Sequence, residues 1–584
     1  MTVTLQQLND SSAADFASLL EGIYEHSPWI PLRAAAQRPF GTLAALKIAL
    51  HRIVLDAGAE LQLALICAHP DLAGSAAFAG RLTSASSEEQ SRAGLLDSSA
   101  AQLADIQDLN SSYRSRFGFP FIVAVRGPDG NGLDRKTIIA TLQRRLKNQR
   151  AEELNECLYQ ISRIAELRLN ALLGVNPVLG QTMMARAAAL ARWSDDSSNL
   201  TCAYLTEAHR NTAQQLADWM RAAGMEVTID AAANVVGRYR SAQPHAKTLI
   251  TGSHYDTVCN AGQYDGRAGI LLAIAVVQQL HERQEKLPFD LEVIGFSEEE
   301  GVRFNSTFLG SSALAGQFDL ALLDKTDAAG ITLRDALTEA GHEVSAIPAL
   351  ARDATNVLGF VELHIEQGPV LLAQNLPAGI VTSIAGSSRY LVDLAGVASH
   401  AGTTPMTMRK DAAAAAAEIV LYVEQRCSGS SALVGTVGQL QVPHGSVNVI
   451  PGACTFSLDI RSTDDTERAK AVSDILNHLE QVCLRRGIAC TVKKIVATSA
   501  VQCAPWLQEQ LMHATQRAGV PVWKLPSGAG HDAMVMAKIT DVAMLFTRCG
   551  NGGISHNPLE TMTADDADMS AQIFLDFLRN LKPV

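Results

Sequence analysis

The sequence predicts a multidomain fold: an all-α N-terminal domain, then an α/β domain interrupted by a smaller α+β domain. Three observations support this fold class. With 584 residues, the chain is too long for one ordinary core and corresponds to roughly three or four structural units. Apolar residues recur at helical spacing through residues 1–173, whereas strand-like and helical runs alternate from about residue 227. Within 384–498 the order of these runs changes again.

The composition narrows the classes of protein and partner. Hydrophobic residues make up 47% and charged residues 18%, which is typical of a globular protein. The net charge of −12 disfavours nucleic acid or an anionic membrane as the main partner. The ten cysteines form no CxxC pair, and the N-terminus has neither the basic nor the apolar region of a signal peptide. We therefore expect a soluble, cytoplasmic protein that spans no membrane.

Residues 1–173 are expected to form the all-α domain. Phe16, Leu19, Leu20 and Ile23 recur at helical spacing, and Ile138–Leu173 forms a long amphipathic helix or a pair of helices. Strand-like runs are scarce. Pro, Gly and Ser interrupt the helices at AHPDLAG, SASSEEQSRAGL and RFGFPFIVAVRG, where loops and helix ends can line a pocket. Taken alone, His69 in the first of these segments suits packing or capping as well as catalysis.

Taken together, EHSPWI, QRPF, HPDLAG, EEQ, FGFPFI and RIAELRL resemble the 2-oxo-4-hydroxy-4-carboxy-5-ureidoimidazoline (OHCU) decarboxylase family over residues 1–173. The resemblance implies an all-helical, cofactor-free enzyme that converts a product of urate oxidation into (S)-allantoin. It makes His69 the acid that protonates the carbanion left after loss of CO2, a step that needs a proton donor. It assigns the substrate-binding positions as follows: Ser86, Glu89 and Gln90 to the ureido and ring groups, Arg163 to the carboxylate, and Pro70, Phe121 and Ile122 to the pocket wall.

The segment GVNPVLG at residues 174–180 separates two helical stretches, so the domain boundary is placed there. The first part of the α/β domain is expected at 177–383 and the second at 499–584. Strand-like runs at Thr248–Thr251, Leu291–Phe296 and Val357–His364 alternate with helical runs. This alternation is typical of a sheet covered by helices.

Potential metal ligands follow several of these strands. His254 and Asp256 stand two apart in GSHYDTV, so on an extended chain they point the same way and Asp256 can bind the second ring N–H of His254. Asp265 follows in GQYDGRAG, at the start of the next helix. SEEEGVRF, ELHIEQGPVL and GISHNPLE add further carboxylates and histidines. Because ligand sites of α/β sheets form at the carboxyl ends of strands, the sequence predicts a site for two Zn²⁺, Mn²⁺ or similar ions.

These segments, with ASHAGTTPM and SGAGHDA, resemble the M20 metallopeptidase-like amidohydrolases, particularly allantoate amidohydrolases and N-carbamoyl-L-amino-acid hydrolases, over about residues 177–584. The resemblance makes Asp265 a bridging ligand. It assigns His254 and His364 to one ion, Glu300 and His556 to the other, and Asp256 to the support of His254. In the triple glutamate it makes Glu299 the general base and leaves Glu298 outside the metal shell. The ions would activate a water for attack on a ureido carbonyl.

Residues 384–498 are expected to form the inserted α+β domain, with the order strand, helix, strand, strand, helix, strand. Its exposed sheet edge suits pairing in a homodimer. The family resemblance makes His400 the donor to the tetrahedral oxygen, supplied by the opposite subunit. It also implies four substrate-binding residues, of which Arg461 can grip a carboxylate with two N–H groups: Gln367, Asn448, Arg461 and His531.

The leading hypothesis is a bifunctional enzyme that combines an OHCU decarboxylase with an allantoate amidohydrolase. The motifs do not separate allantoate from N-carbamoyl amino acids, since both are ureido carboxylates. The fused decarboxylase favours allantoate, although ring opening of allantoin must come between the two reactions and no third catalytic module is visible. One alternative is an N-carbamoyl-L-amino-acid or β-ureidopropionate hydrolase. Another is that the helical domain is catalytically inactive and only binds or oligomerises.

Overall fold

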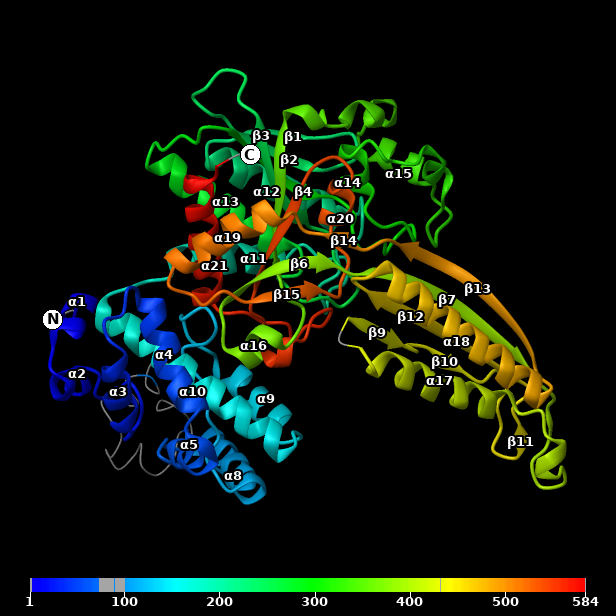
Figure 1. Ribbon diagram of the computed structural model, residues 1–584, viewed down its shortest axis with the longest axis horizontal. Helices are drawn as coiled ribbons and strands as arrows, with labels where there is room; N and C mark the ends of the chain where they lie inside the picture. Colours follow the sequence, from blue (N-terminus) through cyan, green and yellow to red (C-terminus); the bar gives the residue numbers. More distant parts are fainter. Residues whose placement is uncertain (1–2, 73–88, 90–99, 431, 583–584) are drawn as a thin grey trace.

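The computed structural model describes residues 3–72, 89, 100–430 and 432–582. Figure 1 shows a helical N-terminal region, a central body built around a sheet, and an elongated arm. The described helices of the N-terminal region are α1 (Leu5–Asp10), α2 (Ala13–Leu19), α3 (Trp29–Ala34), α4 (Leu43–Leu55), α5 (Gly58–Cys67), α8 (Ala100–Phe117), α9 (Arg135–Arg145) and α10 (Arg150–Leu173).

The helices of the N-terminal region surround one apolar core, to which α4, α5 and α10 contribute buried side chains. Helix α10 begins with a capping box formed by Gln149 and Glu152. It ends at Gly174, whose left-handed backbone (φ 66°) favours glycine and stops the helix. The pair of helices expected at residues 138–173 is present as α9 and α10.

The central body contains a nine-stranded sheet with the order β1-β2-β4-β3-β5-β16-β6-β14, and β15 pairs with β6. Strands β4, β3, β5 and β16 are parallel neighbours, so their carboxyl ends lie at one edge. The strands are β1 (Glu226–Ile229), β2 (Val235–Tyr239), β3 (Thr248–His254), β4 (Asp290–Phe296), β5 (Val357–Ile365), β6 (Ala378–Ile384), β14 (Val501–Gln502), β15 (Lys524–Ser527) and β16 (Val542–Thr547).

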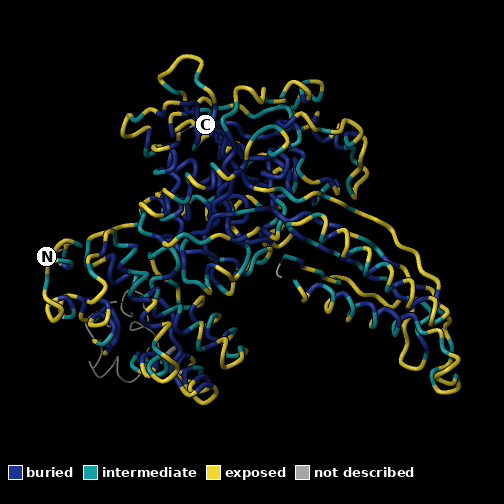
Figure 2. The backbone as a smooth tube through the Cα atoms, in the orientation of Figure 1, coloured by how far each residue is buried: buried dark blue, intermediate teal, exposed yellow. Residues whose placement is uncertain are grey.

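Helices cover both faces of this sheet, which accounts for the concentration of buried chain in the central body (Figure 2). One face packs against α11 (Val178–Leu190), α12 (Glu207–Ala222), α13 (Arg267–Glu282), α19 (Pro505–Arg517) and α21 (Ala564–Asn580). The other packs against α14 (Leu309–Leu314), α16 (Val370–Gln374) and α20 (Ala533–Met536). Helix α15 (Leu333–Glu339) belongs to a separate small core. Strands β3 and β4 are buried along their whole length, as expected for parallel strands that helices cover on both faces.

The arm is an α+β unit whose main sheet has the order β10-β12-β7-β13, with β9 paired to β12. Helices α17 and α18 pack on one face, and β13 forms an edge with mostly exposed residues. The elements are β7 (Gly386–Ala395), β8 (Ser399–His400), α17 (Ala412–Ser428), β9 (Leu433–Thr436), β10 (Leu440–Gln441), β11 (Val449–Ile450), β12 (Ala453–Ser462), α18 (Asp465–Arg486) and β13 (Ala489–Thr498). The second expected strand is divided into β9 and β10, and between them the Gln439 N–H donates to the Ser457 hydroxyl.

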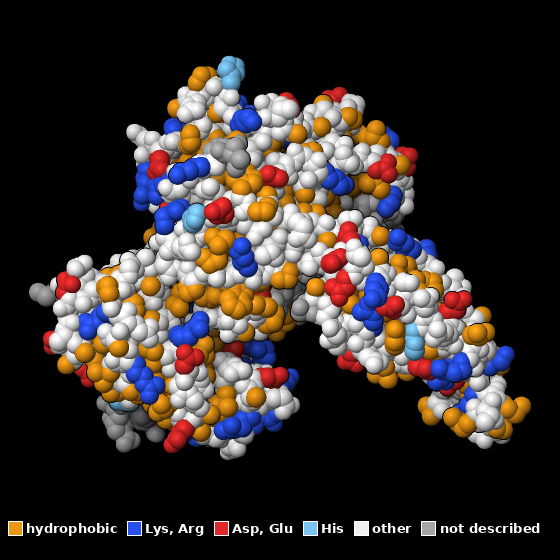
Figure 3. Space-filling view, in the orientation of Figure 1, with side chains coloured by type: hydrophobic (Ala, Val, Ile, Leu, Met, Phe, Trp, Pro, Cys, Tyr) orange, Lys and Arg blue, Asp and Glu red, His pale blue; other side chains and the backbone are white. Residues whose placement is uncertain are grey.

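The N-terminal region packs against the central body near the start of α21, where the Ala564 N–H donates to the Pro128 carbonyl at 2.9 Å. Figure 3 shows the two parts in contact and the arm projecting from the central body. Among the helices within the described residues, none is both long and apolar enough to cross a bilayer.

Candidate functional site

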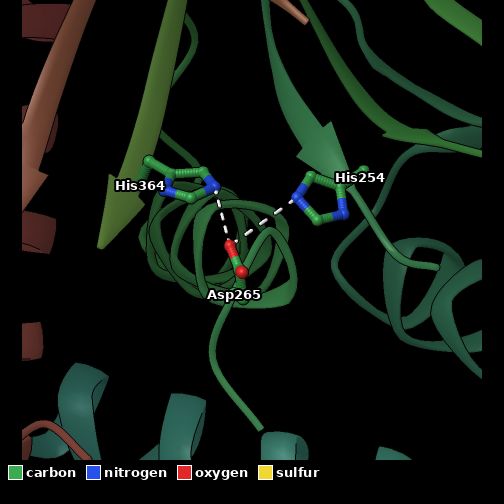
Figure 4. Close-up of side chains that lie close together, drawn as sticks. All are labelled: His254, Asp265 and His364. Carbon is green, nitrogen blue, oxygen red and sulfur yellow. Dashed lines mark ion pairs between the residues drawn. The ribbon is translucent and has the colours of Figure 1, made fainter. Parts of the chain in front are cut away.

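Three chemically active side chains lie at the carboxyl edge of the parallel strands. His254 is the last residue of β3, and His364 is the penultimate residue of the neighbouring β5. Asp265 lies just before α13 and points between them (Figure 4). His254 Nε2 is 3.8 Å and His364 Nε2 is 3.3 Å from Asp265 Oδ1. All three residues are buried.

The donor set of this group fits a divalent cation. His254 Nδ1 lies 3.1 Å from the Asp256 carbonyl and His364 Nδ1 lies 2.8 Å from the Ile365 carbonyl. Since only an N–H can bond a carbonyl, each neutral ring presents an unprotonated Nε2 to Asp265. Asp265 Oδ1 is buried and has no hydrogen-bond partner among the described residues. A divalent cation placed among these three atoms would receive lone pairs from both rings and from the buried carboxylate.

A second group shares the other oxygen of Asp265. His556 Nε2 lies 3.0 Å from Asp265 Oδ2 and 3.5 Å from Glu300 Oε1. The side chain of His556 is 49% exposed, whereas that of His254 is 4% exposed. Gln367 donates to Asp265 Oδ2 at 2.9 Å. Asp265 therefore lies between two groups of potential ligands, as a bridging carboxylate would.

The three consecutive glutamates occupy different environments. Asp256 accepts the backbone N–H groups of Glu299 and Glu300, which fixes the turn after β4. Glu298 lies beside Asp256, and burial together with that carboxylate raises its pKa well above the usual range. Glu299 lies close to His254 and Glu300. Burial raises the pKa of Glu299 well above the usual range and that of Glu300 to about 7. Of the three, Glu300 is the one grouped with Asp265 and His556.

The substrate-binding residues predicted within residues 177–584 do not form one group in the structure. His531 is buried, with its ring 4.5 Å from that of His364 and its Nε2 2.7 Å from the Ser527 hydroxyl. Arg461, on β12, donates to the Gly528 carbonyl at 2.8 Å and to Asp459 at 2.8 Å, so it lies where the arm meets the central body. Asn448 does not join them. Its carbonyl accepts the Ala401 N–H at 2.9 Å, next to His400.

His400 is exposed and lies on β8, which pairs with β11. Figure 1 shows β11 at the outer end of the arm, away from β3 and α13. His400 Nδ1 accepts the backbone N–H groups of Gly402 at 3.1 Å and Thr403 at 3.2 Å. In the neutral ring the proton is therefore on Nε2, which is free to donate.

Two buried carboxylates of the centre were missed in the sequence. Glu560 accepts the backbone N–H groups of Tyr264 at 2.8 Å and Asp265 at 3.1 Å, and so holds the bridging residue. Glu362 accepts the Ser253 hydroxyl at 2.8 Å and lies beside His364. The sequence feature that could have identified Glu362 is its position two residues before His364 on a strand, because such residues lie on the same face of the sheet.

The N-terminal region brings a second set of predicted residues together. His69, Pro70, Glu89, Phe121 and Ile122 line one pocket. His69 is buried; its Nδ1 donates to the Leu65 carbonyl at 3.0 Å, and its Nε2 has no hydrogen-bond partner among the described residues. Burial lowers the pKa of His69 to about 4. Ser86 and Gln90 lie outside the residues that the structure describes.

The arginine of this pocket is Arg168, and Arg163 does not line it. Arg168 donates to Glu89 at 2.8 Å and to Glu25 at 2.9 Å. Arg163 is bound instead by Glu166 and Asp565 at the contact with the central body. The two arginines are five positions apart on α10, which is about 140° of helix rotation, so they point to different faces. Arg168 shares the pocket face with Ile164, four residues earlier.

The fold and these clusters define a class: an α/β protein with a carboxylate and histidine centre suited to two cations, joined to a helical domain with its own polar pocket. Family models match both parts. The chain belongs to peptidase family M20/M25/M40, matched at residues 250–580, and its residues 9–170 match the OHCU decarboxylase family model. Both resemblances seen in the sequence are thereby confirmed.

Several known proteins are similar to this chain over about two thirds of its length. The allantoate deiminase of Arabidopsis thaliana is 38% identical over 436 residues, spanning 69% of this chain and 82% of that protein. The N-carbamoyl-L-amino acid amidohydrolase of Geobacillus stearothermophilus is 38% identical over 377 residues, spanning 65% and 92%. A hydantoinase/carbamoylase-family amidase of Burkholderia multivorans has a similar structure, with a TM-score of 0.65 and 30% identity over 69% of this chain and 98% of that chain.

Proposed function

We propose that the chain is a bifunctional enzyme of purine-ring breakdown. Its N-terminal domain would decarboxylate OHCU to (S)-allantoin, and its C-terminal part would hydrolyse allantoate to ureidoglycine, ammonia and CO2. The observation that carries this proposal is the union, in one chain, of an OHCU decarboxylase-family domain with an M20-family domain whose relatives include allantoate deiminases. Both reactions then act on closely related ureido compounds.

For the hydrolase, His254, His364 and Asp265 would hold one Mn²⁺ or Zn²⁺ ion, and Asp265, Glu300 and His556 the other. Bound divalent ions supply polarisation of the ureido carbonyl and a lower pKa of bound water. Glu299 would take the proton of the attacking water and pass it to the leaving nitrogen, which its raised pKa supports. Asp256 would hold Glu299 and Glu300 in place, and Glu560 would hold Asp265, through the backbone N–H groups that they accept.

Recognition of allantoate would involve Arg461, Asn448, Gln367 and His531, with Arg461 binding the carboxylate. We place His400 of a second subunit at the tetrahedral oxygen, because its own position at the outer end of the arm is far from the cluster of the same chain (Figure 1). Its Nε2–H is free for this donation. The exposed edge strand β13 supports a homodimer formed through the arm.

For the decarboxylase, His69 Nε2 is unprotonated in the neutral ring, because Nδ1 carries the proton bonded to the Leu65 carbonyl. Nε2 would take up a proton from the substrate or from water and then deliver it to the carbanion left by CO2. Arg168 would bind the anionic substrate. Glu89, with Ser86 and Gln90, would hold the ureido and ring groups. The buried His69 with an unpaired Nε2 supports this role. Loss of CO2 followed by protonation balances without any cofactor in this domain.

All ten cysteines are free thiols, which is typical of proteins kept in a reducing compartment. We therefore place the enzyme in the cytoplasm. Small ureido molecules are its proposed partners, without nucleic acid or membrane.

Removal of metal is expected to separate the two activities. A chelator should abolish ammonia release from allantoate and leave decarboxylation of fresh OHCU unchanged, because only the hydrolase cluster is assigned ions. Readdition of Mn²⁺ should restore hydrolysis. The measurement is a paired assay of one preparation before and after chelation. Equal loss of both activities would contradict the assignment of ions to the hydrolase alone.

A second candidate substrate class is favoured by a specific observation: the Geobacillus N-carbamoyl-L-amino acid amidohydrolase is as similar as the plant deiminase, at 38% identity. Assays with allantoate, N-carbamoyl amino acids and β-ureidopropionate would distinguish the candidates. The proposed function fails if a carbamoyl amino acid is hydrolysed and allantoate with Mn²⁺ releases no ammonia.

Replacing Arg168 by methionine is expected to raise the KM for OHCU about tenfold or more, because the variant loses a charge-assisted hydrogen bond worth about 1.5–3 kcal/mol. Arg163→Met is the matched control, since Arg163 is on the same helix but outside the pocket. It should leave the KM for OHCU unchanged. The reverse pattern would show that Arg163 binds the substrate.

A further inference from the structure

We infer that the N-terminal domain is a positioning element for the hydrolase, because it holds the loop that carries His556 in place through Asp565. This inference rests on the proposed metal site and adds a role for residues that neither proposed reaction uses. It concerns the loop between Arg548, after β16, and Ala564, at the start of α21.

Within this loop, the side chain of His556 contacts Asp265, Glu300 and Gln367. Its backbone is left-handed (φ 53°), as is that of Asn551 (φ 48°), and its side chain is half exposed. The loop is closed by the Gly550 N–H, which donates to the Thr561 carbonyl at 2.7 Å. Besides these contacts to other potential ligands, the position of His556 depends on the course of its loop, which is set by Glu560 and by the two ends of the loop.

Two adjacent acids at the start of α21 anchor these ends. Asp566 belongs to the hydrolase itself and binds Arg548 at 2.6 and 3.0 Å. Asp565 is bound from the N-terminal domain. Lys47 on α4 contacts it at 3.0 Å, and Arg163 and Asn170 on α10 bind its two oxygens.

The N-terminal domain also contacts other residues near the two ends of this loop. The Pro128 carbonyl accepts the Ala564 N–H at 2.9 Å. The guanidinium of Arg548 lies 5.9 Å from the centre of the Tyr159 ring. Arg144 Nη2 lies 3.5 Å from the Asn551 side-chain oxygen. These contacts therefore lie near both ends of the loop, at Arg548 and Asn551 and at Ala564 and Asp565.

The ion pairs at Asp565 are buried: the Asp565 side chain is 5% exposed and the Arg163 side chain 4%. A buried carboxylate needs charged partners. Although burial alone would raise the pKa of Asp565, Arg163 and Lys47 hold it well below the usual range. The start of α21 thus carries a negative charge whose cationic partners come from the other domain, and this ties the loop of His556 to that domain.

The test is Asp565→Asn in the full chain. The affinity for one of two Mn²⁺ ions, measured by equilibrium dialysis and by the visible spectrum of the Co²⁺-loaded protein, should fall about 10–100-fold, as for other residues that orient ligands. The second ion should bind as before and decarboxylation should be unchanged, because His69 and Arg168 are untouched. Arg163→Met should have the same effect, and the double variant should be no worse than either single variant.

Arg579→Met is the matched control. It removes an ion pair with Glu285, a residue of the central body, from the far end of the same helix α21. It should keep both metal affinities. The inference is overturned if Asp565→Asn binds both ions like the wild type, or if Arg579→Met weakens them equally. If the wild type binds two ions but does not hydrolyse allantoate, the proposed substrate is wrong, and the metal affinities still decide the inference.

Discussion

Replacing His69 by alanine is expected to reduce OHCU decarboxylation by a factor of about 10²–10⁴, the usual contribution of a general acid. The physical reason is that the unpaired Nε2 of His69 is the ring atom available to the substrate, since Nδ1 is bound to the Leu65 carbonyl. The measurement is the decay of fresh OHCU together with the circular dichroism of the allantoin formed, because an uncatalysed proton transfer is not confined to one face.

The same chain provides the control for His69→Ala. Hydrolysis of allantoate with Mn²⁺ should keep its wild-type rate, since His69 lies in the N-terminal domain. Unchanged decay of OHCU in the variant would contradict the role of His69. It would favour the alternative that the helical domain is catalytically inactive.

Replacing Glu299 by glutamine is expected to reduce the kcat for allantoate by a factor of about 10²–10⁴ while both ions remain bound. The amide has nearly the same shape as the carboxylate but cannot take up a proton. In contrast, Glu300→Gln should lose affinity for one ion, because Glu300 is grouped with Asp265 and His556. The measurements are metal content and kcat for each purified variant.

Glu298→Gln completes this series. Its carboxyl lies beside Asp256, and its raised pKa favours the uncharged form, which an amide resembles. We expect both ions to remain bound and kcat to change less than tenfold. Loss of an ion in Glu299→Gln, together with a large loss of kcat in Glu298→Gln, would show that the roles are shifted by one residue along the triple glutamate.

Much of the fold could be predicted from the sequence, because the underlying signals are local. Helical periodicity identified the N-terminal region, and the strand-like runs between helical runs identified β3 and β4, which the structure buries along their whole length. The division of the second expected arm strand into β9 and β10 was missed, since it involves a contact with a different strand, in which the Gln439 N–H donates to the Ser457 hydroxyl. Pairing between distant segments is not encoded in local periodicity.

The candidate sites show the same limit. His254, Asp265 and His364 were predicted from strand ends, and the structure brings them together. Glu560 was missed because its role depends on two backbone N–H groups about 300 residues earlier in the chain. Arg163 and Arg168 both lie in RIAELRL, and the pattern could not tell which face of α10 meets the pocket. His400 and Asn448 lie at the outer end of the arm, so their assignment to the site requires a second subunit.

The unequal exposure of the two histidine groups has a kinetic consequence. His254 and His364 are buried beneath Asp265, whereas about half of the His556 side chain faces solvent. In the proposed two-metal site, His556 would swing away without opening the core, and the ion that it helps to hold would exchange with solvent through this one movement. The inner site would require a larger opening. Loading would then be ordered, with the inner ion bound for longer, and a protein purified in low metal would retain a half-loaded state.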